Sequence, residues 1–100
     1  MKLGIFVNTD RHLAHLLGIT KAARAKGHEV YVFNMDEGTK LLGEAAFQEL
    51  CTLGGVSMSF CEYNAKGLHV STEGIPEEIV CGSQYHNAVM VHDVDKVIVL

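Results

Sequence analysis

The chain has 100 residues and a mass of 10.9 kDa, which is the length of one domain and leaves no room for a second independent core. Apolar residues make up 48% and charged residues 20%, a globular composition that excludes a disordered or collagen-like chain. Eight lysine and arginine residues against twelve aspartate and glutamate residues give a net charge of −4. A negative net charge disfavours binding to nucleic acid or anionic lipid heads, which are themselves negative. We therefore expect residues 1–100 to form a single domain that binds neither nucleic acid nor a membrane surface.

The apolar segments are too short for export or membrane insertion. The N-terminal run from Leu3 to Val7 falls below the core of about seven residues that a signal peptide needs. No stretch approaches the roughly 20 apolar residues that cross a bilayer. Three cysteines without a CxxC pair fit a reducing compartment better than a disulfide framework. These features predict a cytoplasmic protein.

The first half of the chain predicts strand, helix, strand and helix. Lys2 to Asn8 contains a compact apolar run and predicts a buried strand. Arg11 to Lys26 carries its apolar residues in one stripe of 3.6-residue period and predicts an amphipathic helix. Glu29 to Met35 is rich in β-branched and aromatic residues and predicts the second strand. Thr39 to Leu53 has another apolar stripe, ends before two glycines, and predicts the second helix.

The next segment predicts three shorter elements. Val56 to Phe60 is the third predicted strand, and Cys61 to Lys66 is a brief predicted helix. Either Leu68 to Ser71 or Glu78 to Cys81 supplies the fourth strand, because both are short runs flanked by loop residues.

The last segment predicts one helix and one strand. Ser83 to His92 is the predicted helix, with Tyr85, Ala88 and Val89 facing inward. Lys96 to Leu100 is an apolar run and predicts the final strand.

The alternation of strands and helices predicts the fold class. Because the strands are apolar runs without polar alternation, we expect a small, doubly wound, mainly parallel five-stranded sheet with helices on both faces. In such sheets, ligands and chemistry gather outside the carboxyl ends of the strands. The residues that follow each strand are therefore the candidates for a functional site.

Cys61 is the first candidate for chemistry. It follows the third strand and precedes the short helix, so its sulfur is expected at a helix N-terminus on the carboxyl edge of the sheet. Backbone N–H groups there favour the thiolate, which is the nucleophilic form. The adjacent Glu62 opposes a second negative charge. The alternative is a small buried cysteine that only packs.

The other two cysteines are weaker candidates. Cys81 occupies a similar junction between a strand and a helix, and Gly82 beside it gives another group room to approach the sulfur. It is either a second thiol that acts with Cys61 or a packed loop residue. Cys51 lies near the end of the second helix, on the flank of its apolar stripe, and is expected to pack.

Polar residues at the same edge are expected to be neighbours of the thiol. Asn8 and His12 follow the first strand, and Asn34 follows the second. His12 and His15 are three residues apart, but no third metal ligand stands at a defined spacing. The sequence also has no glycine-rich phosphate loop and no G-x-S-x-G elbow. We therefore predict neither a metal nor a cofactor.

Four segments resemble the DsrE/DsrF/TusD-like family of small sulfur-relay proteins. They are the start from Lys2 to Asn8, the segment from Lys26 to Val30, the segment from Val56 to Cys61 followed by Lys66-Gly67-Leu68, and the segment from Cys81-Gly82 to Ile98. The resemblance implies a small doubly wound sheet that forms homo- or hetero-oligomers. It also implies that Cys61 carries a persulfide and passes the sulfur to a partner.

Three hypotheses for function follow. The first is a sulfur carrier in which Cys61 takes sulfane sulfur from a protein donor and gives it to a protein acceptor. The second is an oligomeric module that binds a small ligand between Asn8, Asn34 and Cys61. The third is a redox sensor with a reversible disulfide between Cys61 and Cys81. A domain this small buries only about two-thirds of its chain's surface, so a homo-oligomer is expected in each case.

Overall fold

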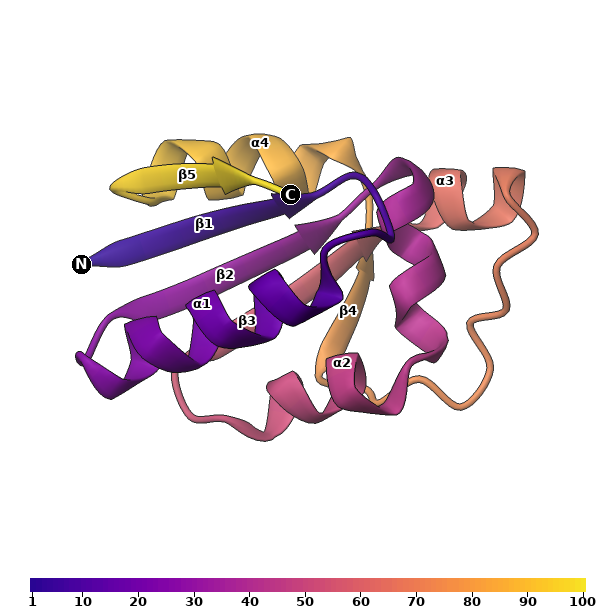
Figure 1. Ribbon diagram of the computed structural model, residues 1–100. Helices are drawn as coiled ribbons and strands as arrows, with labels where there is room; N and C mark the ends of the chain where they lie inside the picture. The colour runs from indigo at the N-terminus through magenta and orange to yellow at the C-terminus, as the bar shows by residue number, and fades with distance from the viewer.

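The computed structural model describes residues 1–100 and contains one sheet of five strands, in which all neighbouring strands run parallel. The strands are β1 (Lys2–Val7), β2 (Glu29–Asn34), β3 (Val56–Cys61), β4 (Ile79–Gly82) and β5 (Lys96–Val99). Their order is β4-β3-β2-β1-β5, so the chain builds outward from β1 to β4 and then returns to the other side of β1 (Figure 1). This confirms the doubly wound parallel architecture predicted from the apolar runs.

Helices cover the two faces of the sheet unequally. α1 (Leu13–Ala25) and the helical segment after β2 pack on one face, called here the α1 face, and α4 (Gln84–Asp93) lies along the other, the α4 face (Figure 1). Side chains alternate between the faces along each strand. The α4 face holds a small buried cluster of Phe33, Cys61 and Met90. The α1 face holds the large core, whose buried strand residues include Ile5, Val7, Val30, Val32, Met58 and Phe60.

The prediction of one continuous helix from Thr39 to Leu53 is wrong. The chain forms a 3₁₀ helix η1 (Asp36–Gly43), a short α2 (Ala45–Glu49) and a 3₁₀ turn η2 (Leu50–Thr52). The break falls at Glu44, whose backbone is extended, directly after Gly43, a residue of low helix propensity. The apolar residues of the predicted stripe are still buried, among them Leu42, Phe47 and Leu50.

The structure decides between the two candidates for the fourth strand. Glu78 to Cys81 is confirmed as the site of β4, whereas Leu68 to Ser71 lies in the connection that precedes it. Ile79 joins the large core, which anchors β4 to the sheet. The brief helix predicted after β3 is α3 (Glu62–Gly67).

The last predicted helix is α4, but the residue that it buries is not one of those predicted. Tyr85 and Val89 are 72% and 41% exposed, Ala88 is also exposed, and Met90 is the buried side chain. α4 lies on its face of the sheet without a second helix beside it, so only one narrow side of the helix is covered (Figure 1). The expectation that Tyr85, Ala88 and Val89 face inward as buried residues is therefore wrong, although Tyr85 and Val89 border the open space between α4 and the sheet.

α1, with 13 residues, is the longest helix of the chain. None of the helices combines the length with the apolar character that crossing a bilayer requires.

Candidate functional site

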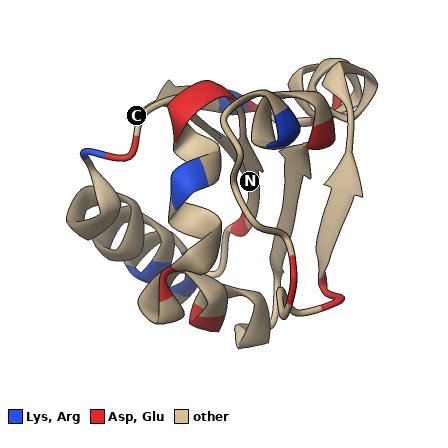
Figure 2. Cartoon of the chain, turned by 90° about the vertical axis from the view of Figure 1, so that its right-hand side faces the viewer, with Lys and Arg blue, Asp and Glu red and all other residues tan.

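The residues predicted to form the site lie at or near the carboxyl ends of four strands. Asn34 ends β2, Cys61 ends β3, Cys81 is next to the end of β4, and Asn8 directly follows β1. Figure 2 shows the side of the molecule on which α3 lies in Figure 1, and acidic and basic segments are interspersed over it. The structure does not bring these residues into one pocket, because the strand ends direct them to different faces of the sheet.

Asn34 lies on the α1 face, away from Cys61. Its Cα is paired with those of Val7 and Phe60, which both belong to the large core. The side chain is fully buried, and its amide donates a hydrogen bond to the carbonyl oxygen of Gly38 at 2.8 Å. Asn34 therefore holds the turn after β2 and does not line a thiol site.

Asn8 and His12 belong to a different cavity, which they share with His15 and Leu100. The backbone N–H of Asn8 donates to the carbonyl oxygen of Leu100 at 2.9 Å. The rings of His12 and His15 meet edge to face with their centroids 5.7 Å apart. No three side chains of His, Cys, Asp or Glu come close enough together to hold a metal ion. The predicted grouping of Asn8 and His12 with Cys61 is thus not observed.

Cys61 is a free thiol in a shielded position. Its side chain is 2% exposed and packs with Phe33 and Met90 on the α4 face. It is also the residue that precedes α3, as predicted, although α3 has only six residues. A buried thiol at this place is protected from solvent, and a reagent reaches it only after neighbouring side chains move.

Cys81, in contrast to Cys61, is an exposed thiol. Its Sγ donates a hydrogen bond to Oε2 of Glu62 at 2.9 Å, and Glu62 is also paired with Lys66. The hydrogen bond to Glu62, partial desolvation and the negative charge of Glu62 raise the pKa of the Cys81 thiol. The same hydrogen bond, together with Lys66, lowers the pKa of Glu62. Cys81 is therefore accessible but mostly protonated at neutral pH.

Cys61 and Cys81 point to opposite faces of the sheet. In the pairing of β3 with β4, Cys61 lies opposite Gly82, and Cys81 lies opposite Phe60 of the large core. Residues on neighbouring strands that are offset by one position direct their Cβ atoms to opposite sides. Two such cysteines cannot form a disulfide without movement of the backbone. This geometry argues against the predicted redox pair.

Cys51 packs against the large core, as predicted. Burial and the charge of Glu78 raise the pKa of its thiol, which disfavours the nucleophilic form.

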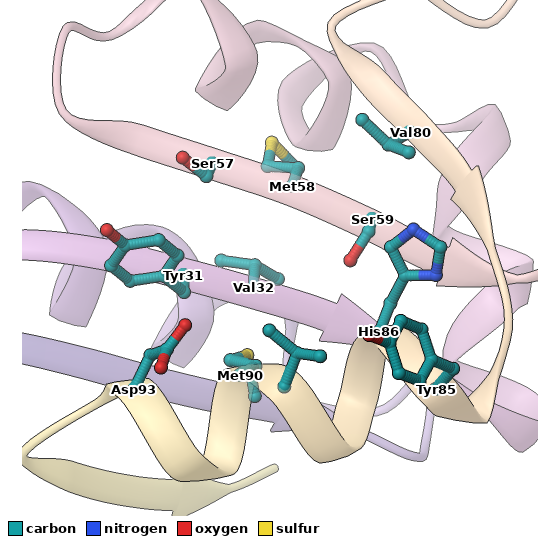
Figure 3. A pocket seen from close by; sticks show the side chains of 11 residues that line it. Tyr31, Val32, Ser57, Met58, Ser59, Val80, Tyr85, His86, Met90 and Asp93 are labelled. Atoms are coloured by element: carbon teal, nitrogen blue, oxygen red, sulfur yellow. The ribbon is translucent and has the colours of Figure 1, made fainter.

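A pocket of about 370 Å³ opens on the α4 face between α4 and strands β2, β3 and β4 (Figure 3). Its walls are largely apolar, and the polar groups within it come from both the helix and the strands. Its lining includes Tyr31, Ser57, Ser59, Val80, His86, Val89, Met90 and Asp93. Volume and lining are those of a small-molecule site.

His86 is the most informative residue of this pocket. Its imidazole lies over Gly82: a Cβ on Gly82 would come within 2.7 Å of the ring nitrogen Nδ1. Because Gly82 is the residue opposite Cys61, the ring occupies the place of the side chain next to the Cys61 thiol. Met90, one helical turn further along α4, contacts both the pocket and the Cys61 cluster.

The hydrogen bonding of His86 fixes where its proton lies. Ser83 caps α4, and its backbone N–H donates to Nδ1 of His86 at 3.2 Å, which completes a capping box. Since Nδ1 accepts this bond, the neutral ring carries its proton on Nε2. Figure 3 shows the ring directed away from α4 into the space between Ser59 and Val80. His86 therefore presents an N–H donor to the pocket.

The pocket residues were not predicted from the sequence. The one available signal was Ser83 three residues before His86, the spacing of a capping box, directly after a glycine at a strand end. That the glycine lies opposite Cys61 depends on the β3–β4 register, which the sequence does not reveal.

Comparison with known proteins supports the fold. No protein-family model and no curated protein sequence matches the chain. Among solved structures, the YchN protein from E. coli superimposes with a TM-score of 0.80 at 17% identity, over 99% of this chain and 97% of that chain. A protein of unknown function, MTH1491 from Methanobacterium thermoautotrophicum, gives a TM-score of 0.78 at 14% identity, over 99% and 98%. The chain therefore has the DsrE-like α/β fold over its whole length.

Proposed function

We propose that the protein is a cytoplasmic sulfur carrier in which the Cys61 thiol accepts a sulfane sulfur and passes it on as a persulfide. The observation that supports this most is the position of a free, shielded thiol at the carboxyl end of β3, with the His86 ring beside it. The DsrE-like fold and the sequence resemblance to sulfur-relay proteins favour the same function. Cys81 and Cys51 are weaker candidates, because their surroundings raise the pKa of each thiol and so disfavour the thiolate.

The proposed step is an exchange without net oxidation. The Cys61 thiolate attacks the outer sulfur of a donor persulfide, so that a new S–S bond forms to Cys61 and the S–S bond of the donor breaks. The donor leaves as a thiolate and takes up the proton that Cys61 has released. An acceptor thiol then removes the outer sulfur by the same exchange, which returns Cys61 to its starting state.

Burial of Cys61 suits a carrier. A persulfide exposed to water and free thiols is lost to side reactions, whereas one enclosed by Phe33 and Met90 is shielded until a partner arrives. Donor and acceptor then reach the sulfur only when the cluster opens, which restricts the transfer to molecules that can open it.

Sulfur uptake tests this proposal. The protein is incubated with inorganic polysulfide, excess reagent is removed, and the intact mass is measured before and after reduction. We expect a reducible gain of one sulfur atom in the wild type, Cys81→Ala and Cys51→Ala, and no gain in Cys61→Ala. Alanine is preferred to serine because a buried, unpartnered hydroxyl costs about 1–3 kcal/mol of stability. An equal gain in a folded Cys61→Ala variant excludes Cys61 as the carrier.

A second function, an oligomeric binding module, is favoured by the exposed apolar surface. Val97 and Val99 of the edge strand β5 are 42% and 58% exposed on the α4 face, and neighbouring exposed apolar side chains of this kind are typical of a subunit interface. We therefore propose that the chain works as a homo-oligomer, which sedimentation equilibrium tests directly. A normal oligomer that takes up no sulfur at Cys61 would favour the binding module over the carrier.

A further inference from the structure

The pocket on the α4 face has two chemically different ends. Ser59 and His86 lie toward the carboxyl end of the sheet, and Tyr31 and Asp93 lie at the opposite end (Figure 3). The middle is apolar, and no lysine or arginine lines the pocket. Along α4, His86 and Asp93 are seven residues apart, which corresponds to about 10 Å at the helical rise. An extended, largely apolar molecule fits this shape.

Three lining residues connect the inner end of the pocket to Cys61. Ser59 precedes Cys61 by two positions on β3 and therefore points to the same face. His86 lies over Gly82, the residue opposite Cys61. Met90 lines the pocket and also packs in the Cys61 cluster. The thiol thus belongs to a buried cluster that shares Met90 with the pocket wall, and Met90 is an unbranched, adaptable side chain.

We infer that this pocket admits a low-molecular-weight persulfide to Cys61, and that the His86 Nε2–H and the Ser59 hydroxyl stabilise the sulfur that leaves. The inference rests on the function proposed above and extends it to the class of donor. A protein cysteine on a rigid surface cannot enter a pocket under α4, whereas a small organic persulfide can place its sulfur end beside His86 and its body along the apolar wall.

The two hydrogen-bond donors, His86 and Ser59, each have a role in the transfer step. When the Cys61 thiolate attacks the outer sulfur of the donor, the S–S bond of the donor breaks and negative charge develops on its inner sulfur, which lies in the pocket. No lysine or arginine among the lining residues can neutralise this charge. The N–H of His86 and the O–H of Ser59 are the groups placed to stabilise it. The leaving thiolate then takes up the proton released by Cys61.

The outer end of the pocket selects the donor by charge. Asp93 carries a carboxylate, one oxygen of which interacts with His92 at 3.2 Å. A carboxylate on the donor body would be repelled there, whereas an ammonium group would be attracted. The pocket therefore favours neutral or amine-bearing persulfides over carboxylate-bearing ones.

The main test compares His86→Gln with His86→Glu. Both side chains offer an oxygen to the Ser83 N–H and keep the capping box, but only glutamine keeps an N–H donor. The rate of sulfur loading on Cys61 is measured by quenched reaction and intact mass, with a para-aminomethyl benzyl persulfide as donor. We expect loading about 10- to 100-fold slower in His86→Glu than in His86→Gln, because glutamate lacks the N–H donor and adds a negative charge beside the developing thiolate. Wild-type loading in His86→Glu overturns the role of His86.

Two further comparisons test the pocket itself. Val89→Trp adds bulk at a lining position that is 41% exposed, so the variant is expected to fold and to load slowly from the benzyl persulfide. The para-carboxyl benzyl persulfide is expected to load more slowly than the aminomethyl one, and Asp93→Asn should remove that difference. Unchanged benzyl persulfide loading in Val89→Trp overturns the pocket as the route of entry.

Inorganic polysulfide distinguishes a failure of the pocket inference from a failure of the carrier function, because it has no organic body to place in the pocket. If polysulfide loads Cys61 while benzyl persulfide loading is insensitive to Val89→Trp and His86→Glu, the carrier function stands and the pocket inference fails. If neither reagent loads Cys61, the proposed function itself fails.

Discussion

The imidazole of His86 fills the space that a side chain on Gly82 would occupy. A Cβ on Gly82 would lie 2.7 Å from Nδ1 and 2.8 Å from Cγ of the ring. Glycine at this position therefore lets a residue from α4 reach the strand end directly opposite Cys61. The absence of a side chain at Gly82 therefore decides which residue lies beside Cys61. Adding a methyl group at Gly82 tests this.

Gly82→Ala should displace His86. We expect a loss of about 1–3 kcal/mol of unfolding free energy from overpacking, together with slower sulfur loading of Cys61. Urea unfolding gives the first quantity and intact mass gives the second. In a double variant with His86→Ala, the added methyl group no longer meets the ring, so the two losses of stability should sum to more than the loss in the double variant. Strict additivity would show that the two residues do not interact.

Met90→Ala should open the pocket to Cys61. Met90 lines the pocket and belongs to the buried cluster of Cys61, so its truncation is expected to raise the rate of Cys61 alkylation by iodoacetamide at least about tenfold, the effect of lowering a barrier by roughly 1.4 kcal/mol. Leu50→Ala is the control, because it removes a buried side chain from the large core on the other face. Equal acceleration in both variants would point to general loosening instead of a local opening.

The pH dependence of Cys81 alkylation should follow its contact with Glu62. The Glu62 carboxylate raises the pKa of the Cys81 thiol, so the thiolate forms only at higher pH. Glu62→Gln should therefore shift the alkylation profile to lower pH. The charge of Lys66 acts in the opposite direction, so Lys66→Gln should shift the profile to higher pH. Peptide mass mapping after alkylation across a pH series reads out Cys81 alone, and an unchanged profile in Glu62→Gln would contradict the contact.

Asn34 should matter for stability and not for sulfur chemistry. Asn34→Ala removes the buried hydrogen bond to the Gly38 carbonyl and is expected to cost about 1–3 kcal/mol. At a temperature where both proteins are folded, sulfur loading of Cys61 should equal that of the wild type. A loss of loading without a loss of stability would place Asn34 in the thiol site after all.

The sequence was sufficient for the order of elements because each strand is a compact apolar run. Ile79 illustrates the limit: its strand was one of two candidates, and only its burial in the large core distinguishes it from the loop before it. The break at Glu44 was missed because the apolar stripe continues across it, so periodicity alone indicated one helix.

The candidate site was harder to predict because it depends on register. Asn34 and Cys61 both end neighbouring strands, yet Asn34 pairs with Phe60, and Cys61 therefore points to the other face. A shift of one residue in the β2–β3 register would direct both side chains to the same face of the sheet. No feature of the sequence fixes that register. His86 was missed for the same reason. Its ring lies near Cys61 only because it covers Gly82, and Gly82 pairs with Cys61 in the β3–β4 register.

The most direct test of the central claim follows one sulfur atom through Cys61. The protein is loaded with isotopically labelled polysulfide, freed of reagent and mixed with an acceptor thiol, and the Cys61 peptide and the acceptor are weighed by mass spectrometry over time. The carrier account predicts that labelled sulfur disappears from the Cys61 peptide at the rate at which it appears on the acceptor. Label on another cysteine, or label on Cys61 that the acceptor cannot remove, would contradict it.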